Sequence, residues 1–90
     1  MSQETPSPLP EARSDVEVFE TADGLVIYDP DGDRAHHLNP SASLIFFLCT
    51  GQVDHTEMAR HLAGAFELDA PPLDEVAQCL ATLRTEGLLR

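Results

Sequence analysis

The stretch LVIYDPDGDRAHHLNPSASLIFFLCTG, residues 25–51, contains two strand-like segments, a turn and the start of a helix. Segments 25–29 and 34–38 are short and suit strands, and the Asp/Gly-rich residues between them are typical of a hairpin turn. Asn39 followed by Pro40 indicates a helix start, because Asn caps free N–H groups and Pro loses no hydrogen bond at the first helical position. The stretch therefore predicts a β-hairpin that leads directly into a helix.

The hairpin turn also resembles the start of a calcium loop, with Asp29, Asp31 and Asp33 at alternate positions. An EF-hand loop needs Gly at position six and a bidentate Glu at position twelve. Those positions hold Arg34 and Pro40. A tight turn with solvated carboxylates explains the pattern better, and we expect no metal here.

On the N-terminal side, the alternating residues 16–20 (VEVFE) predict a further strand, which a turn at 22–24 joins to the hairpin. Residues 1–14 (MSQETPSPLPEARS) are rich in Pro, Ser and Glu and carry few apolar side chains. We expect this segment to be disordered and dispensable for folding. The folded domain is then expected to span residues 15–90.

On the C-terminal side, residues 41–50 are apolar on almost every side, which predicts a helix central to the core that ends at Gly51. Asp54 and Glu57 resemble a capping box that opens a second helix. The predicted buried stripe of that helix consists of Met58, Leu62, Ala65 and Phe66.

A third helix is predicted to begin after the DAPP break at residues 69–72 and to end at Gly87. Its apolar positions are Leu73, Val76, Ala77, Leu80, Leu83 and then Leu88. Three strands followed by three helices define an α+β fold, a three-stranded antiparallel β-meander with three α-helices in a small winged-helix-like domain. This architecture alone does not indicate what the domain binds.

The charge of the chain disfavours two classes of partner. Sixteen acidic residues face five arginines without any lysine, for a formal net charge of -11. Such a surface repels nucleic acid and anionic lipid, since affinity for both comes mainly from clustered Lys and Arg. No signal peptide and no run of 18 apolar residues is present in the sequence, so we expect a cytosolic protein without a membrane partner.

The side chains able to carry chemistry do not form a familiar site. His36 and His37 are adjacent in a predicted strand and point to opposite faces, so they cannot readily hold one ion. His55 and His61 are six positions apart on a predicted helix and also diverge. We expect no metal and no cofactor.

The two cysteines, Cys49 and Cys79, are widely separated and lie in apolar helical patterns, which favours free thiols over a disulfide. No Gly-x-Ser-x-Gly elbow or phosphate-binding loop accompanies the possible nucleophiles. The protein is therefore predicted not to be an enzyme. The remaining feature is the outer strand 34–38, which has no proline and one charge and whose edge could accept an extended peptide.

Residues 16–90 resemble the PqqD family. In the pattern of this family, a Leu-Asn pair precedes a helix that starts with small residues and continues as an apolar helix. A Gly, a second helix that begins with Thr, and a final helix that closes in Leu-x-x-x-Gly-Leu-Leu follow. In this chain the corresponding features are Leu38-Asn39, Ser41-Ala42, Ile45 to Leu48, Gly51, Thr56, and Leu83 through Gly87-Leu88-Leu89. Each motif is common, but their order and spacing together are fairly specific.

The resemblance implies a RiPP recognition element, which binds the leader segment of a ribosomally made precursor peptide and delivers it to a modifying enzyme, in many cases a radical SAM maturase. It implies docking against the third strand in a cleft beside the third helix. The implied strand residues are Arg34, Ala35, His36, His37 and Leu38. The implied helix wall is drawn from Val76, Cys79, Leu80 and Leu83, with Leu80 favoured as a core residue.

Two alternatives to peptide recognition are a winged-helix transcription regulator and another kind of protein–protein adaptor. A regulator needs a basic recognition helix. The predicted third helix instead carries Asp74, Glu75 and Glu86 against Arg84, which counts against DNA binding. Cys79 stands where a larger apolar residue is common in the family, and the acidic N-terminal segment is not part of the family pattern.

Overall fold

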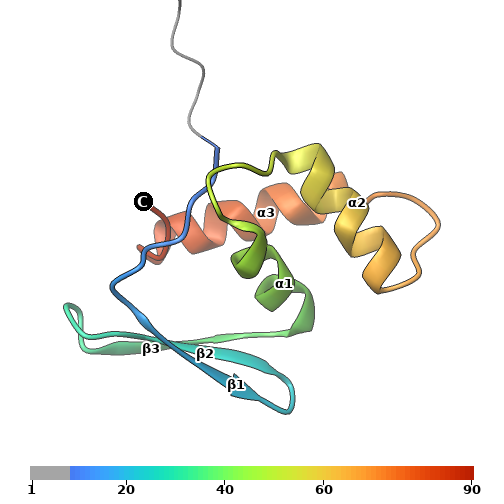
Figure 1. Ribbon diagram of the computed structural model, residues 1–90. Coiled ribbons are helices and arrows are strands. Elements are labelled where there is room, and N and C mark those ends of the chain that lie inside the picture. Colours follow the sequence, from blue (N-terminus) through green and yellow to red (C-terminus); the bar gives the residue numbers. More distant parts are fainter. Residues whose placement is uncertain (1–8) are drawn as a thin grey trace, which may run out of the picture.

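The computed structural model describes residues 9–90, and in it three strands precede three helices, as predicted (Figure 1). The elements are β1 (Glu17–Thr21), β2 (Gly24–Asp29), β3 (Arg34–Leu38), α1 (Pro40–Leu48), α2 (His55–Ala65) and α3 (Leu73–Thr85). The strands form one antiparallel sheet in the order β1-β2-β3, so β1 and β3 are its edges. The α+β prediction is confirmed, and the likeness to a winged helix extends only to this outline.

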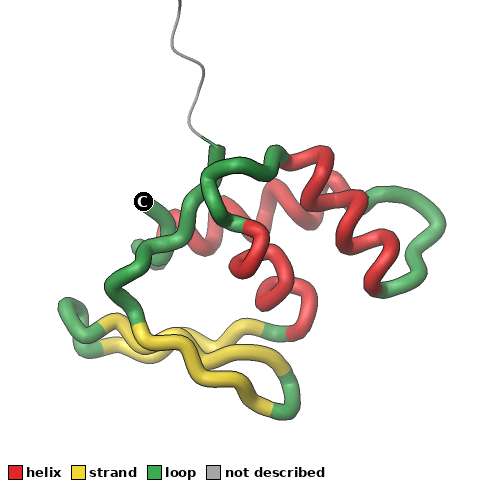
Figure 2. Tube along the Cα trace, in the orientation of Figure 1, coloured by secondary structure: helices red, strands yellow, loops and turns green. Residues whose placement is uncertain are grey.

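The three helices lie over one face of the sheet (Figure 2). Helix α1 packs against β2, β3, α2 and α3, so it is the central helix of the core, as its composition predicts. Along β2, Leu25 and Ile27 are buried on the helix side, whereas Val26 and Tyr28 alternate onto the other face. None of the helices within residues 9–90 has the length and apolar character needed to cross a membrane.

Local hydrogen bonds start α1 and α2 where the sequence predicts. The Asn39 side chain accepts hydrogen bonds from the Ala42 N–H at 2.8 Å and from the Ser41 hydroxyl at 3.1 Å. The Asp54 side chain accepts one from the Glu57 N–H at 2.8 Å. These caps satisfy N–H groups that have no partner inside the helix.

The predicted buried stripe of α2 is partly wrong. Met58 and Leu62 are buried, but Ala65 and Phe66 are exposed, and Ala59 is buried in their place. The apolar spacing identifies the correct face of the helix, but it cannot show that the last turn of α2 extends beyond the elements that bury the first two turns. Phe47 of α1 is likewise exposed, although its helix is apolar on nearly every side.

The first eight residues of segment 1–14, which is predicted to be disordered, lie outside the described part of the chain, and residues 9–14 form contacts that its composition does not predict. Backbone N–H groups donate to distant carbonyls at 2.8–3.0 Å, in the pairs Ala12 to Cys49, Gly51 to Pro10, Arg13 to Leu88 and Arg90 to Glu11. These bonds join the segment to the α1–α2 connection and to the C-terminal residues. Backbone hydrogen bonds need no apolar side chain, so composition could not reveal them.

Arg13 links this segment to the β2–β3 turn. Its guanidinium donates to the carboxylates of Asp15 at 2.9 Å and Asp29 at 3.0 Å, and to the Gly87 carbonyl at 3.0 Å. The hydrogen bonds from Arg13 hold the pKa of the Asp29 carboxyl below its usual range. Asp29 also accepts the Asp31 N–H at 3.1 Å, which closes the turn locally. Of the three aspartates that resemble a calcium loop, Asp29 and Asp31 therefore pair with Arg13, and Asp33 accepts a hydrogen bond from the Tyr28 hydroxyl at 2.7 Å.

Replacing Arg13 with alanine should lower the melting temperature by several degrees at neutral pH, because Asp29 is only 8% exposed and would lose its counter-charge. The folded-state pKa of Asp29 lies below the unfolded value of about 4. The part of the Arg13 contribution that comes from Asp29 is therefore complete above about pH 4 and is lost as the pH falls through the folded pKa, whereas the hydrogen bond to the Gly87 carbonyl remains.

Circular dichroism melts of the parent, Arg13→Ala and Arg60→Ala between neutral and strongly acid pH test this prediction. Arg60 is exposed and has no ion pair within residues 9–90, so its variant serves as the matched control for loss of a positive charge. Equal melting temperatures for the two variants at neutral pH, or a difference that does not shrink on full acidification, would contradict the assigned role.

Candidate functional site

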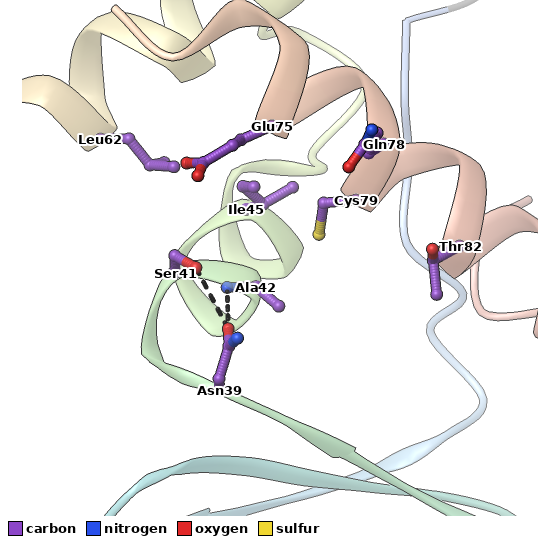
Figure 3. Close-up of a pocket in the computed structure, with 9 residues that line it drawn as sticks. All are labelled: Asn39, Ser41, Ala42, Ile45, Leu62, Glu75, Gln78, Cys79 and Thr82. Atoms are coloured by element: carbon purple, nitrogen blue, oxygen red, sulfur yellow. Dashed lines mark hydrogen bonds between the residues drawn. The ribbon is translucent and has the colours of Figure 1, made fainter.

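A pocket opens between the start of α1 and one side of α3 (Figure 3). It is lined by Asn39, Ser41, Ala42 and Ile45 from the start of α1, by Leu62 from α2, and by Glu75, Gln78, Cys79 and Thr82 from α3. Ile45 and Leu62 are almost fully buried, so they form an apolar floor. The rim consists of neutral polar groups and one carboxylate.

A second, more apolar pocket adjoins the first one. It shares Asn39, Ser41, Leu62 and Glu75 with the first pocket and adds Pro40, Phe66 and Leu68. We call the two together the α1–α3 groove. It runs along the exposed side of α3 from Thr82 past Glu75 and ends at the exposed side chains of Phe66 and Leu68.

Strand β3 leads into the α1–α3 groove, because Asn39 directly follows its last residue. Farther back along β3, His36 is buried, and its Nδ1 lies 3.0 Å from Glu86 Oε1 at the C-cap of α3. This contact joins β3 to the residue that follows α3, whereas the strand itself packs against β2 and α1. The edge residue His37 lines a separate pocket with residues of β1, β2 and the turn between them.

The backbone groups on the free edge of β3 follow from the strand register. Thr21 and Gly24 close a two-residue turn, and such a turn closes on a hydrogen-bonded pair. Along a strand, the N–H and C=O groups of successive residues point to opposite neighbours. In β2 the groups that point to β3 are therefore those of Leu25, Ile27 and Asp29, and their partners in β3 are Leu38, His36 and Arg34. The N–H and C=O groups of Ala35 and His37 are thereby left pointing away from the sheet (both residues are exposed).

Gly24 agrees with this assignment. A Cβ at Gly24 would lie 1.9 Å from the Leu38 carbonyl oxygen, so that carbonyl is directed at β2. The backbone of Gly24 also has a φ of 142°, which side chains rarely permit. Glycine is therefore required at the point where β2 and the end of β3 approach each other.

The structure separates the predicted site residues into two groups. Arg34, Ala35 and His37 are exposed on the edge strand, whereas His36 and Leu38 are buried beneath it. On α3, Cys79 lines the groove and is half-buried. Val76, Leu80 and Leu83 are no more than 1% exposed, belong to the core and line neither pocket of the groove.

On the side of α3 that lines the groove, sequence reasoning identified only Cys79. The α3 residues that line the groove recur at spacings of three and four, as the core residues of α3 do, but they lie one position earlier along the helix. They are Glu75, Gln78, Cys79 and Thr82. That spacing was visible in the sequence, but apolar character directs attention to the buried stripe. Asn39, Ser41 and Ala42 were recognised only as the start of a helix.

The two thiols do not form a nucleophilic site. Burial raises the pKa of Cys79, and burial raises the pKa of the Cys49 thiol to about 12. Both sulfurs are therefore protonated at neutral pH, whereas the nucleophile in cysteine chemistry is the thiolate. Within residues 9–90, no group of three His, Cys, Asp or Glu side chains is placed to hold a metal ion.

Comparison with known proteins supplies one match. The family described as coenzyme PQQ synthesis protein D (PqqD) matches residues 24–89, from the start of β2 to beyond the end of α3. No curated protein and no solved structure matches the chain. The family match covers most of the chain and includes both β3 and the α1–α3 groove, so the chain belongs to the PqqD family.

Proposed function

We propose that this protein binds the leader segment of a ribosomally synthesised precursor peptide and presents it to a modifying enzyme, such as a radical SAM maturase. The observation that carries the proposal is the free edge of β3, a strand that leads through Asn39 into the α1–α3 groove. Membership of the PqqD family supports it, since family members are accessory proteins that bind precursor peptides. The protein acts by binding, without catalysis of its own, and in the cytosol, where precursor and enzyme are made.

The leader segment pairs with β3 as a fourth strand. Ala35 and His37 each offer one N–H donor and one C=O acceptor, which permits about four backbone hydrogen bonds worth roughly 1 kcal/mol net each. Ordering the paired peptide residues costs about 1–2 kcal/mol per residue, which cancels most of that gain. Apolar side chains of the leader must therefore supply the remaining affinity by burial against Ile45, Leu62 and Cys79 in the groove.

DNA is a poor alternative partner. Helix α3 carries Asp74 and Glu75 in its first turn and Glu86 at its end, against Arg84. The net charge of -11 adds a general repulsion from phosphate. A winged-helix regulator would need the opposite charge on its recognition helix.

Fluorescence anisotropy with labelled synthetic peptides tests the proposal. The probes are the N-terminal segments of precursors encoded by short reading frames next to this gene, with the same peptides in scrambled order as controls and a duplex DNA as competitor. One segment should bind with equimolar stoichiometry and micromolar or tighter affinity, without competition from DNA. Failure of every segment to bind better than its scrambled control would contradict the proposal, and so would a preference for DNA. A general adaptor for folded proteins would also give this negative result.

A further inference from the structure

We propose that the α1–α3 groove selects leader segments that carry a Lys or Arg side chain close to an apolar anchor, and that Glu75 is the residue that determines this specificity. The inference rests on the proposed function and specifies the chemistry of the peptide. It is carried by the position of one carboxylate at the junction of two pockets and by the absence of a positive partner for it among the described residues.

Glu75 lines both pockets of the groove. Its side chain extends from α3 toward Leu62 (Figure 3). The ion pairs formed within residues 9–90 involve Arg13 and His36, and no hydrogen bond to the Glu75 carboxylate occurs in that part of the chain. A ligand in either pocket would therefore meet a carboxylate without a counter-charge.

The rest of the groove offers only neutral groups. No Lys or Arg is among the described residues that line the two pockets. On one side of Glu75 lie the amide of Gln78 and the hydroxyl of Thr82, and on the other side lie the apolar side chains of Phe66 and Leu68, each 41% exposed. Glu75 is exposed in the free protein, and a peptide that covers it would remove part of its water, which is unfavourable unless a positive group pairs with it.

The occupant that fits these surroundings is an extended peptide with two adjoining features. An apolar side chain covers Phe66 and Leu68, and a Lys or Arg side chain a short distance along the peptide donates hydrogen bonds to Glu75. A nucleic acid lacks the cation, and an acidic peptide would place like charges together. The cationic peptide is also attracted by the net charge of the whole chain.

Selection from a display library of random peptides of about a dozen residues tests the inference without knowledge of the natural precursor. The full chain, Glu75→Gln and Asp74→Asn are each used as bait. Asp74 is the matched control, because it shares the first turn of α3 with Glu75 but lines neither pocket. Removing either carboxylate costs the same interaction with the helix dipole, so only loss of Glu75 changes the groove.

The parent and Asp74→Asn should enrich peptides with Lys or Arg at a fixed spacing from an apolar residue, and Glu75→Gln should lose this preference. For one enriched peptide made synthetically, Glu75→Gln and replacement of the peptide cation by norleucine should each weaken binding by about tenfold, and the two changes together should do little more than either alone.

Enrichment of peptides without a cationic preference would overturn the role of Glu75 and leave the proposed function standing. An equal loss of preference in Asp74→Asn would likewise overturn it, because the effect would then belong to the net charge rather than to the groove. If no bait enriches any peptide, the proposed function fails and the inference fails with it.

Discussion

Replacing Cys79 with glutamate should weaken binding of the leader segment by at least roughly 30-fold, or about 2 kcal/mol, while the domain stays folded. Cys79 is half-buried and lines the groove between the floor residues and the rim. Glutamate is larger than cysteine, so its side chain would fill space that the peptide needs. It would also place a charge where an apolar peptide side chain is expected to pack, and that charge loses water when the peptide binds.

Ala77→Glu is the matched control for this variant. Ala77 lies two positions away on the same helix, is exposed, and does not line the groove. Both variants add one carboxylate to α3, so they share any effect of net charge or helix propensity. Melting temperatures near that of the parent show that both proteins are folded. If Cys79→Glu is folded and binds the leader as well as Ala77→Glu does, the leader does not occupy this groove.

Ala35→Pro and His37→Pro should each reduce leader binding by about tenfold, and the double variant should reduce it further. Proline removes the backbone N–H and leaves a peptide carbonyl without its donor. The register assigns both N–H groups to the free edge of β3, so the bonds between β3 and β2 are retained. Proline is tolerated on an edge strand when the lost N–H faces outward.

The other edge of the sheet supplies the control. In β1 the backbone groups of Thr21, Phe19 and Glu17 point to β2. The N–H of Glu20 therefore points away from β2. Glu20→Pro should therefore leave binding unchanged, with a melting temperature similar to those of the β3 variants. Equal losses of binding from both edges would point to a general disturbance of the sheet. Full binding by the folded double variant would show that β3 does not receive the peptide.

Features set by local interactions could be predicted from the sequence. The caps at Asn39 and Asp54 involve residues only three positions apart, and the Asp/Gly turn before Arg34 is encoded by its own residues. The position of β3 at an edge also followed, because a meander of three strands has its first and last strands outside. These predictions required no knowledge of how distant segments meet.

The features that the sequence did not predict share a dependence on distant contacts. Arg13 binds Asp29 and the Gly87 carbonyl, and neither partner could be identified from the composition of an acidic, Pro-rich segment. Val76 is buried and does not line the groove. Which side of α3 is buried depends on how the helix is rotated about its own axis against α1. Apolar spacing predicts which stripe of a helix is buried, but the neighbouring stripe lines the groove.

His36 combines a correct expectation with an unexpected contact. It lies in β3 as predicted, yet its side chain is buried and pairs with Glu86 at the end of α3. This contact joins the edge strand to the residue that follows α3, whereas His37 next to His36 is exposed. Adjacent strand residues face opposite sides of the sheet, and this alternation decides which histidine supports the strand from within and which lies at the surface.

Amide hydrogen exchange followed residue by residue, with and without the bound leader segment, tests most directly whether the peptide adds a strand to β3. Added pairing should slow exchange of the Ala35 and His37 amides by at least about tenfold, because their outward N–H groups would become hydrogen-bonded. The outward amides of Val18 and Glu20 on β1 should exchange at unchanged rates. Saturating peptide that leaves Ala35 and His37 exchanging as in the free protein, or that protects β1 in their place, would contradict strand addition at β3.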